Sequence, residues 1–287
     1  MNIYQHKDEI IIKGIRDFDP THTFMCGQCF RWEKEEDGSY TGVSHGRVIN
    51  IRVENDSIVI KNSNMEDVNN IWLNYLDLDR DYSQIKLRYE NDIHLKKAME
   101  FGSGIRILNQ EVFECLISFI ISTQNGIPRI KKIVSGLSQM YGKKIEFCEK
   151  TYYSFPTAED MRGITEKDLE SLKPGYRAAY IVDAVNKILS GEINLDKISQ
   201  MNTDDARKEL LKIKGVGPKV ADCVLLFSCK KTDAFPIDVW VSRIMRNLYC
   251  GEETSINNIQ KYARDNFGEF AGMAQQYLFY YARENSI

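Results

Sequence analysis

The hydrophobic pattern of the chain changes its period near residue 64, and this change limits the fold class more than any other feature. Before it, the chain contains the segments "DEIIIKGIR", "CFRWEKE", "SYTGVSH", "VINIRVE" and "SIVIKN". These segments alternate apolar with polar residues or are β-branched, as β-strands are. Turn sequences separate these segments, at 37–38, 45–46 and 54–56. We therefore expect an antiparallel meander with one face solvated or covered by helices.

Beyond residue 64 the period is helical, beginning with "EDVNNIWLNYL" at 66–76. Segment 111–124 is apolar nearly all round, which predicts a buried central helix. A capping box at 165–168 precedes a short helix. Further helices are expected at 128–142, 176–191, 203–213, 218–229, 238–249, 255–268 and 272–284. The predicted fold is α+β: an N-terminal antiparallel β domain over 1–105, packed on a mostly helical body over 106–287 that contains a helix–hairpin–helix motif.

Composition is that of a globular protein, with 43% apolar and 28% charged residues among 287. The first ten residues, "MNIYQHKDEI", do not resemble a signal peptide. The longest apolar runs, "CLISFII" and "VLLF", are too short to cross a bilayer. We expect a cytoplasmic protein without a membrane partner.

Seven cysteines are present, an odd number with scattered spacing, so free thiols are expected. Cys26 and Cys29 form a C-x-x-C pair, which raises a redox or zinc interpretation. A zinc site needs about four ligands, and no second pair follows. We interpret the two cysteines as small, half-buried residues of a strand, and we assign no metal to the four isolated histidines.

The net charge of −3 does not indicate a nucleic-acid-binding protein, but the charge is unevenly distributed. Residues 129–144 carry five basic residues and no acidic one, and residues 207–219 carry five against one. A cleft lined by such segments can be positive on an acidic protein. Two solvated helix faces explain the same pattern equally well.

"LLKIKGVGPKVADC" (210–223) predicts two helices joined by a tight turn. Gly215 and Gly217 allow backbone angles closed to other residues, and Pro218 suits a first helical position. The free N–H groups of the second helix then form an anion site that fits a DNA phosphate. A purely structural turn between helices would need the same glycines, but it would not need Lys219.

Lys219 lies at the start of this second helix, where the helix dipole and burial would lower the pKa of its ammonium group. A lysine of lowered pKa is a Schiff-base nucleophile, although a solvated surface lysine is the simpler alternative. Cys223 follows on the same helical face, where it could take a proton or pair with Lys219 as an ion. Asp238 in "AFPIDVW" can cap the next helix. In the same cleft, its carboxylate would also stabilise a cationic sugar intermediate.

"KGVGPKVADC" and "PIDVW", with nineteen residues from Lys219 to Asp238, resemble the helix–hairpin–helix DNA glycosylases. The combination of lysine and aspartate is similar to the bifunctional members, which cut the glycosidic bond and then nick the abasic strand. Four further segments, in order along nearly the whole chain, resemble the 8-oxoguanine DNA glycosylases. They are "CGQCFRW" (26–32), "QEVFECLISFIISTQNGIPRI" (110–130), "LKPGYRAAYI" (172–181) and "GMAQQYLFYYA" (272–282).

The resemblance implies a role for each matching residue and a TBP-like β domain at the N-terminus. Lys219 would attack C1′ with Cys223 as its partner, and Asp238 would stabilise the oxocarbenium-like state. The carbonyl of Gly27 would accept the N7–H that distinguishes 8-oxoguanine from guanine. The other implied roles are base binding by Gln275, Phe279 and Cys223, contacts to the opposite cytosine and the gap by Gln124, Arg129, Tyr176 and Arg177, and phosphate binding by Gly215, Gly217 and Val220.

Four positions depart from the family pattern, and one of them is Cys29, which replaces a serine. Gln124 stands where these enzymes often have asparagine, as in the endonuclease III-like relatives, so a gap-filling role is kept. Trp240 replaces the usual histidine and Ala282 replaces an acid thought to pair with it, which puts the phosphate contact there in doubt. No cysteine follows Cys250, so the iron–sulfur loop of the endonuclease III relatives is absent.

The sequence thus predicts an enzyme that removes 8-oxoguanine opposite cytosine from duplex DNA and then performs β-elimination. It would act as a monomer and require no cofactor, although an ion, monovalent or calcium, could bind hairpin carbonyls near Leu211, Ile213 and Val216. Its partner would be double-stranded DNA with oxidised guanine, associated with the nucleoid in a prokaryote. The alternatives are a glycosylase for alkylated purines, which usually needs only the aspartate, and a non-catalytic helix–hairpin–helix DNA-binding protein.

Overall fold

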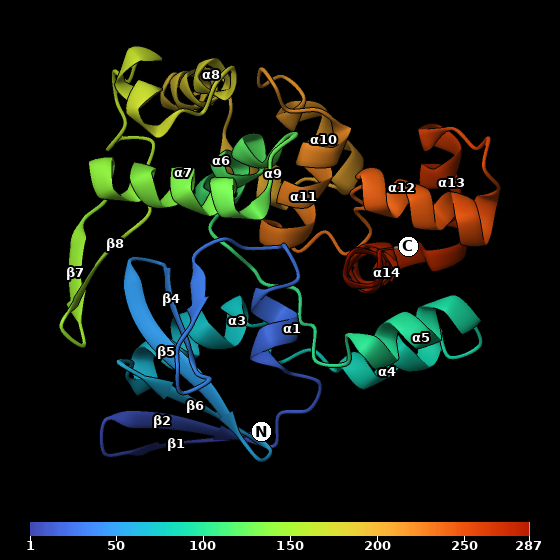
Figure 1. The fold of residues 1–287 in the computed structure, drawn as a ribbon, viewed down its shortest axis with the longest axis horizontal. Helices are drawn as coiled ribbons and strands as arrows, with labels where there is room; N and C mark the ends of the chain where they lie inside the picture. The colour runs from blue at the N-terminus through green and yellow to red at the C-terminus, as the bar shows by residue number, and fades with distance from the viewer. Residues whose placement is uncertain (287) are drawn as a thin grey trace.

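The computed structural model describes residues 1–286, which form a β-sheet region and a larger helical body (Figure 1). Six antiparallel strands make the sheet: β1 (Asn2–His6), β2 (Glu9–Lys13), β3 (Trp32–Lys34), β4 (Tyr40–Ser44), β5 (Arg47–Glu54) and β6 (Ser57–Lys61). Their spatial order is β1-β2-β6-β5-β4-β3. The predicted antiparallel sheet is confirmed, but a simple meander is wrong, because β2 pairs with β6 and not with β3.

The departure from a meander arises at β2, which pairs with β6 in the register Ile10 to Ile60 and Ile12 to Ile58. Helix α1 (Pro20–Phe24) and a long loop then carry the chain across to β3. Alternation along β2 predicts a strand but not its neighbour. The inward residues of both strands belong to the buried core of the sheet region, which also contains Trp32.

One face of the sheet is covered by helices, as the alternation predicts. The covering segment consists of α2 (Met65–Asp67), the π-helix η1 (Val68–Trp72) and α3 (Leu73–Tyr75). Trp72 and Tyr75 are buried there with the inward isoleucines of the sheet. The Trp32 indole donates a hydrogen bond to the Tyr75 hydroxyl over 2.8 Å.

The helical body follows, arranged around the nearly all-apolar helix α6 (Val112–Ser122). Its other helices are α4 (Tyr82–Arg88), α5 (Ile93–Phe101), α7 (Ile127–Tyr141), α8 (Arg177–Leu189), α9 (Leu195–Gln200), α10 (Thr203–Leu210), α11 (Pro218–Ser228), α12 (Val239–Met245), α13 (Ile256–Phe267) and α14 (Ala271–Asn285). Short π and 3₁₀ segments complete it: η2 (Lys167–Leu172), η3 (Arg246–Cys250) and η4 (Gly268–Phe270). Helix α6 packs on α11, as expected for a buried central helix. The predicted α+β fold is confirmed.

Two features of the body bear on the predicted organisation. Helix α5 packs on α14, and α4 and α5 bury Ile85 and Leu95 in the core of the helical body. A hairpin of β7 (Lys144–Phe147) and β8 (Lys150–Tyr153) interrupts the helices and was not predicted. The division at 105/106 stays a prediction.

The C-x-x-C pair lies in the loop between α1 and β3, so its placement in a strand is wrong. Both thiols are fully buried rather than half-buried, and burial raises the pKa of Cys26 to about 11 and that of Cys29 well above its usual value. Across residues 1–286 no cluster of histidine, cysteine and acidic side chains is suited to a metal ion. Over the same residues, no helix has both the length and the apolar character needed to span a bilayer.

Candidate active site

The helix–hairpin–helix motif forms as predicted, from α10, the turn at 211–217 and α11. Pro218 occupies the first turn of α11. Lys219 comes next and points into a cleft, where its Nζ donates to Ser122 Oγ over 3.3 Å. The same Nζ lies 5.0 Å from the centre of the Phe119 ring. The lysine is therefore held against the end of α6 rather than extended into solvent.

A small cavity of about 40 Å³ lies in front of Lys219 and joins segments far apart in the sequence. Three of its lining residues, Lys219, Cys223 and Asp238, are the predicted catalytic residues. Gly27, Gln275 and Phe279, the predicted base-binding residues, line the same cavity, together with Phe119, Phe227, Pro236 and Gln276. The structure thus brings both predicted groups into one site.

Cys223 is buried one helical turn after Lys219, and burial raises the pKa of its thiol to about 12 although Lys219 opposes this shift. The thiol is therefore protonated at neutral pH, which argues against the ion pair with Lys219 as the resting state. A neutral thiol can still pack flat against a base.

Asp238 caps α12, because its carboxylate accepts the N–H of Val241 over 2.8 Å. Burial raises the pKa of this carboxyl, and the hydrogen bond from Val241 and the charge of Lys219 act in the opposite direction. The two roles expected of Asp238, helix cap and neighbour of Lys219 in the cleft, are compatible in one geometry.

The loop that carries Gly27 has a fixed shape. Gly27 has φ of +87°, which disfavours other residues. Gln28 is completely buried and its amide donates to the carbonyls of Thr23, over 2.8 Å, and Arg106, over 2.7 Å. The backbone carbonyl of Gln28 accepts a hydrogen bond from the side-chain amide of Gln110 over 2.7 Å. These bonds fix the turn on which the Gly27 carbonyl is presented.

The four residues expected at the opposite cytosine and the gap lie together between the end of α6 and the start of α8. Tyr176 is half exposed, at 49%, and its hydroxyl lies 3.4 Å from Gln124 Oε1. Gln124 has φ of +48°, which turns the chain toward this point. Arg129 donates to the carbonyl of Lys173 over 2.9 Å and remains exposed.

Arg177 differs from its neighbours because it is only 4% exposed. Its guanidinium donates to the carbonyls of Thr123, Gln124 and Pro174. It also lies 4.5 Å from the centre of the Tyr176 ring. In this geometry Arg177 mainly fixes the loops that present Tyr176 and Gln124, and Arg129 is the arginine exposed at this surface.

The two hairpin glycines serve different purposes. Gly215 has φ of +81°, and a Cβ there would lie 2.1 Å from the Tyr180 ring. Gly217 has φ of −96° and ψ of −179°, which any residue adopts, so the prediction of special backbone angles is wrong there. A Cβ at Gly217 would meet nothing within 4 Å, so this side of the turn is open for a phosphate to approach. Val220 is buried, and only its backbone N–H can face that side.

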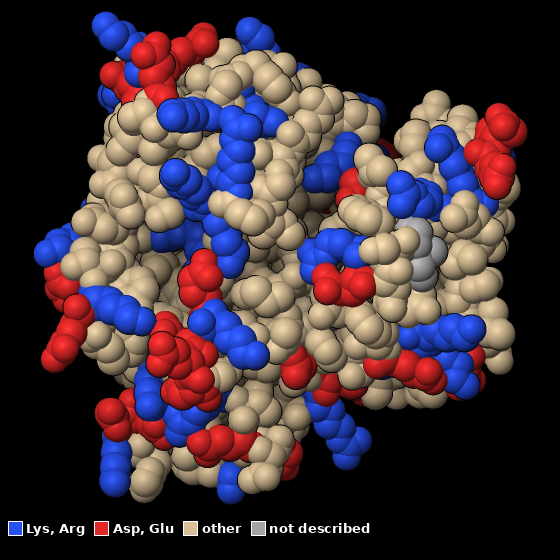
Figure 2. All heavy atoms as spheres, in the orientation of Figure 1, with Lys and Arg blue, Asp and Glu red and all other residues tan. Residues whose placement is uncertain are grey.

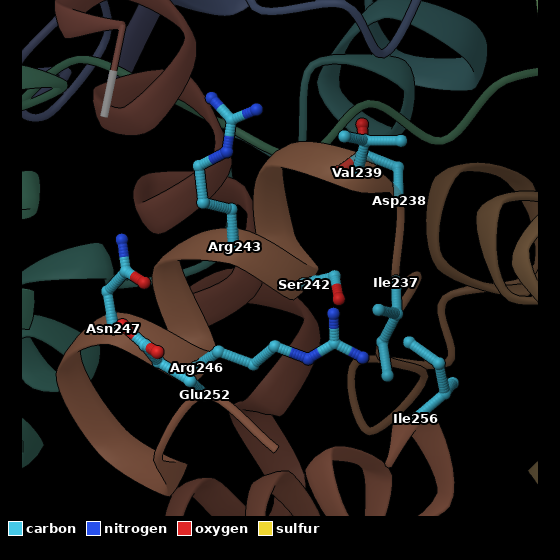
Figure 3. Close-up of a pocket in the computed structure, with 9 residues that line it drawn as sticks. All are labelled: Ile237, Asp238, Val239, Ser242, Arg243, Arg246, Asn247, Glu252 and Ile256. Atoms are coloured by element: carbon cyan, nitrogen blue, oxygen red, sulfur yellow. The ribbon is translucent and has the colours of Figure 1, made fainter. Parts of the chain in front are cut away.

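A larger hollow, of about 580 Å³, lies beside the base cavity and shares Asp238 with it (Figure 3). Arg246 extends toward Ser242 and Ile237, whereas Arg243 points away from them. Arg243 lies 5.2 Å from the centre of the Trp240 ring. A cation therefore stands next to the tryptophan that replaces the family's histidine. Arg243 and Arg246 both line the hollow, and Figure 2 shows Lys and Arg side chains interspersed with Asp and Glu side chains on one face of the molecule.

The basic segment at 207–219 is less available than the sequence suggests. Arg207 pairs with Asp204 and Asp222, and Lys208 and Lys212 pair with acidic residues three positions before them. Most of this segment is thus a solvated, internally paired helix surface. Sequence reasoning also missed Phe119 and Gln276, which line the cavity, Ser122, which accepts from Lys219, and Arg283, which lies next to Gly27. Only the folding of α6 and α14 brings these residues to the site.

Comparison with known proteins agrees with this geometry. Residues 10–116 match the family model for the 8-oxoguanine DNA glycosylase N-terminal domain, and residues 117–267 match that for the HhH-GPD superfamily base excision DNA repair protein. The helix–hairpin–helix body, with a lysine and an aspartate in one cavity, places the protein in the class of DNA glycosylases. The chain belongs to the HhH-GPD superfamily of base excision DNA repair proteins.

Named relatives show how far the similarity extends. A probable N-glycosylase/DNA lyase of Methanothermobacter thermautotrophicus is 34% identical over 68% of this chain and 69% of its own length. The N-glycosylase/DNA lyase OGG1 of Arabidopsis thaliana is 28% identical over 90% of this chain and 75% of its own. The 8-oxoguanine glycosylase/lyase of Clostridium acetobutylicum, in complex with duplex DNA containing cytosine opposite 8-oxoG, superposes with a TM-score of 0.98. It is 46% identical and covers 100% of this chain and 99% of its own.

Proposed function

We propose that the protein removes 8-oxoguanine from duplex DNA opposite cytosine and then cuts the abasic strand as a lyase. The observation that carries this proposal is the single cavity in which Lys219, Cys223 and Asp238 meet Gly27, Gln275 and Phe279. The similarity to the Clostridium acetobutylicum enzyme over the full chain supports the same substrate.

In the proposed reaction, the flipped base occupies the cavity between Phe279 and Cys223. The Lys219 amine, as the free base, attacks C1′ while the bond to the base breaks and the base leaves with the electron pair. The carboxylate of Asp238 stabilises the positive charge that develops on the sugar. The attached nitrogen then loses a proton and the C1′–O4′ bond of the sugar breaks, with O4′ taking up a proton, which gives a protonated Schiff base. The Schiff base makes the C2′ proton acidic, and loss of this proton expels the 3′ phosphate by β-elimination.

The nearby residues have roles in binding rather than in the chemistry. Tyr176 and Gln124 fill the gap left by the flipped base, whose unstacking costs free energy, and Arg129 donates to the unpaired cytosine. Backbone N–H groups at Gly215, Gly217 and Val220 bind a phosphate. The hairpin carbonyls near Leu211, Ile213 and Val216 could bind a monovalent or calcium ion. The carbonyl of Ile213 also accepts a hydrogen bond from the N–H of Val216 over 3.1 Å. The enzyme would act as a monomer on DNA in the cytoplasm, without a cofactor.

Borohydride trapping tests the proposal directly. The protein is incubated with a duplex holding one 8-oxoguanine opposite cytosine, and an undamaged duplex serves as the control. A covalent protein–DNA band on the damaged duplex only, lost in Lys219→Gln while lesion binding persists, is the expected result. Lesion binding without a band would point to a monofunctional glycosylase or a binding protein. Because a DNA-3-methyladenine glycosylase of Bacillus subtilis is 28% identical over 68% of the chain, alkylated purines belong in the substrate panel.

A further inference from the structure

Among residues 1–286, two buried polar side-chain atoms near the base cavity have no hydrogen-bond partner: Gln275 Oε1, on a residue that lines the cavity, and Arg283 Nη1, which lies behind the lining next to Gly27. Gln275 already has a proposed role at the Watson–Crick edge of the base, whereas Arg283 has none. We propose that Arg283 is a second specificity residue, whose Nη1 donates a hydrogen bond to the C8 carbonyl oxygen of the flipped 8-oxoguanine. This inference rests on the proposed function.

The Arg283 side chain is held in place through its Nε and Nη2 atoms, which leaves Nη1 without a partner among residues 1–286. It lies on α14, one helical turn after Phe279, and its side chain is 17% exposed. Its Nη2 donates to the carbonyl of Met25 over 2.7 Å, and its Nε donates to Glu284 over 2.9 Å. The guanidinium carbon lies 5.4 Å from the centre of the Phe279 ring. The Nη1 atom therefore remains available while the rest of the guanidinium is fixed.

Arg283 Nη1 lies next to Gly27, the residue proposed to contact the oxidised edge of the base. A Cβ added at Gly27 would lie 3.0 Å from Arg283 Nη1 and 3.2 Å from Phe279 Cε1. Nη1 is thus adjacent to the residue whose carbonyl is proposed to accept the N7–H of the base. On 8-oxoguanine the N7–H donor and the C8 carbonyl acceptor are neighbours on one edge. An acceptor from Gly27 beside a donor from Arg283 complements that edge.

Guanine presents the opposite pattern at this edge. Its N7 is an acceptor, which would face the Gly27 carbonyl, and its C8 carries a hydrogen that offers nothing to Arg283. Both contacts would then be lost with the undamaged base. A site built to form hydrogen bonds rejects an analogue that lacks them, because buried polar groups are left unpaired. The Gly27 carbonyl and Arg283 Nη1 together therefore discriminate 8-oxoguanine from guanine more strongly than the Gly27 carbonyl alone.

The cavity must widen before a base can bind, and this widening would expose Nη1. Its 40 Å³ corresponds to about three water molecules, which is too small for a purine. Phe279 both lines the cavity and lies against the space between Gly27 and Nη1. Displacement of Phe279 by the base would open the cavity and bring the unpartnered donor to its wall.

Arg283 also has an anchoring role, which any test must separate from a direct contact. Its bond to Met25, together with the 2.9 Å bond from Gln276 Nε2 to the Cys26 carbonyl, ties α14 to the loop that carries Gly27. Loss of an anchor would displace the Gly27 carbonyl for every substrate. Loss of a contact to the C8 oxygen would matter only for substrates that carry this oxygen.

The experiment is therefore a cycle of variants against substrates. Single-turnover excision is measured opposite cytosine for 8-oxoguanine and for 8-thioguanine, which keeps N7–H but replaces the oxygen by sulfur, a weaker acceptor. A hydrogen bond from a charged donor predicts that Arg283→Leu slows excision of 8-oxoguanine about tenfold or more. The same variant should slow excision of 8-thioguanine much less. Arg283→Lys, which keeps the charge but not the fork, should show the same asymmetry and carries the test if the leucine variant does not fold.

Two control variants complete the design. Gln276→Leu removes the hydrogen bond from α14 to the Cys26 carbonyl and should slow excision of both substrates equally. Arg162 is exposed and paired with Glu159, so Arg162→Leu should change neither rate. Equal losses on both substrates in the Arg283 variants, with normal wild-type activity, would reduce Arg283 to an anchor and overturn the inference. Failure of the wild-type protein to excise 8-oxoguanine would overturn the proposed function itself, and the inference with it.

Discussion

Replacing Asp238 by asparagine should separate stability from activity. The carboxylate accepts the Val241 N–H at the start of α12, and an asparagine oxygen can accept the same bond. Burial raises the pKa of the Asp238 carboxyl, so its charge destabilises the folded state. Because the folded state binds the proton more tightly, this penalty is absent below the unfolded pKa and grows as pH rises through the folded pKa. Asp238→Asn should therefore be at least as stable as the wild type at pH 7.

Asp238→Ala loses the cap and provides the comparison. Loss of an N-cap costs about 1 kcal/mol, which corresponds to about 2–4 °C in Tm for a protein of this size class. Thermal unfolding at pH 7 should show this decrease for alanine and not for asparagine. Both variants lack the carboxylate charge, so excision of 8-oxoguanine should slow about 100-fold or more in each, by analogy with the loss of one preorganised electrostatic partner. An asparagine variant that excises at the wild-type rate, or that melts as low as the alanine variant, would refute the reasoning.

Three further predictions concern the hairpin, a buried acid and a surface cation. Gly215→Ala should lower Tm because of its positive φ and the close ring beside it, whereas Gly217→Ala should leave Tm unchanged and weaken duplex binding in a titration. Burial raises the pKa of Glu114 from 4.5 to about 7, so stability should fall by about 3 kcal/mol as pH rises through this range, and urea unfolding of Glu114→Gln should show a flatter pH profile. Arg243→Leu, which removes the cation over Trp240, should reduce the slope of log K against log salt by about one if Arg243 contacts a phosphate; an unchanged slope would exclude that contact.

The sequence predicts elements whose pattern is local and misses arrangements that depend on distant partners. Strands β3 to β6 are correct because each alternates or is β-branched, and turn sequences separate each strand from the next. The partner of β2 is wrong because alternation specifies which side chains face inward, not which strand lies beside them. The hairpin of β7 and β8 escapes notice because its strands are short and its side chains only partly buried.

At the site too, the sequence predicts features set by neighbouring residues and not those set by residues distant in the chain. The position of Lys219 on a helix start and the cap formed by Asp238 follow from neighbouring residues, and both are confirmed. That the two residues share a cavity with Gln275 follows from the family resemblance and from the fold, not from spacing. The distinction between Gly215 and Gly217 needs the Tyr180 ring, which comes from another helix.

Arg283 illustrates what only the three-dimensional arrangement can supply. In the sequence it is one of two charged residues near the end of a helix, where a solvated side chain is the ordinary expectation. In the structure its guanidinium crosses to Met25 and leaves one donor buried beside Gly27. A buried donor without a partner destabilises the free protein, so a substrate that supplies the missing acceptor recovers that free energy on binding. The same reasoning applies to Gln275 Oε1, so the two unpartnered atoms together describe a ligand with a donor on one edge and an acceptor on another, as 8-oxoguanine has.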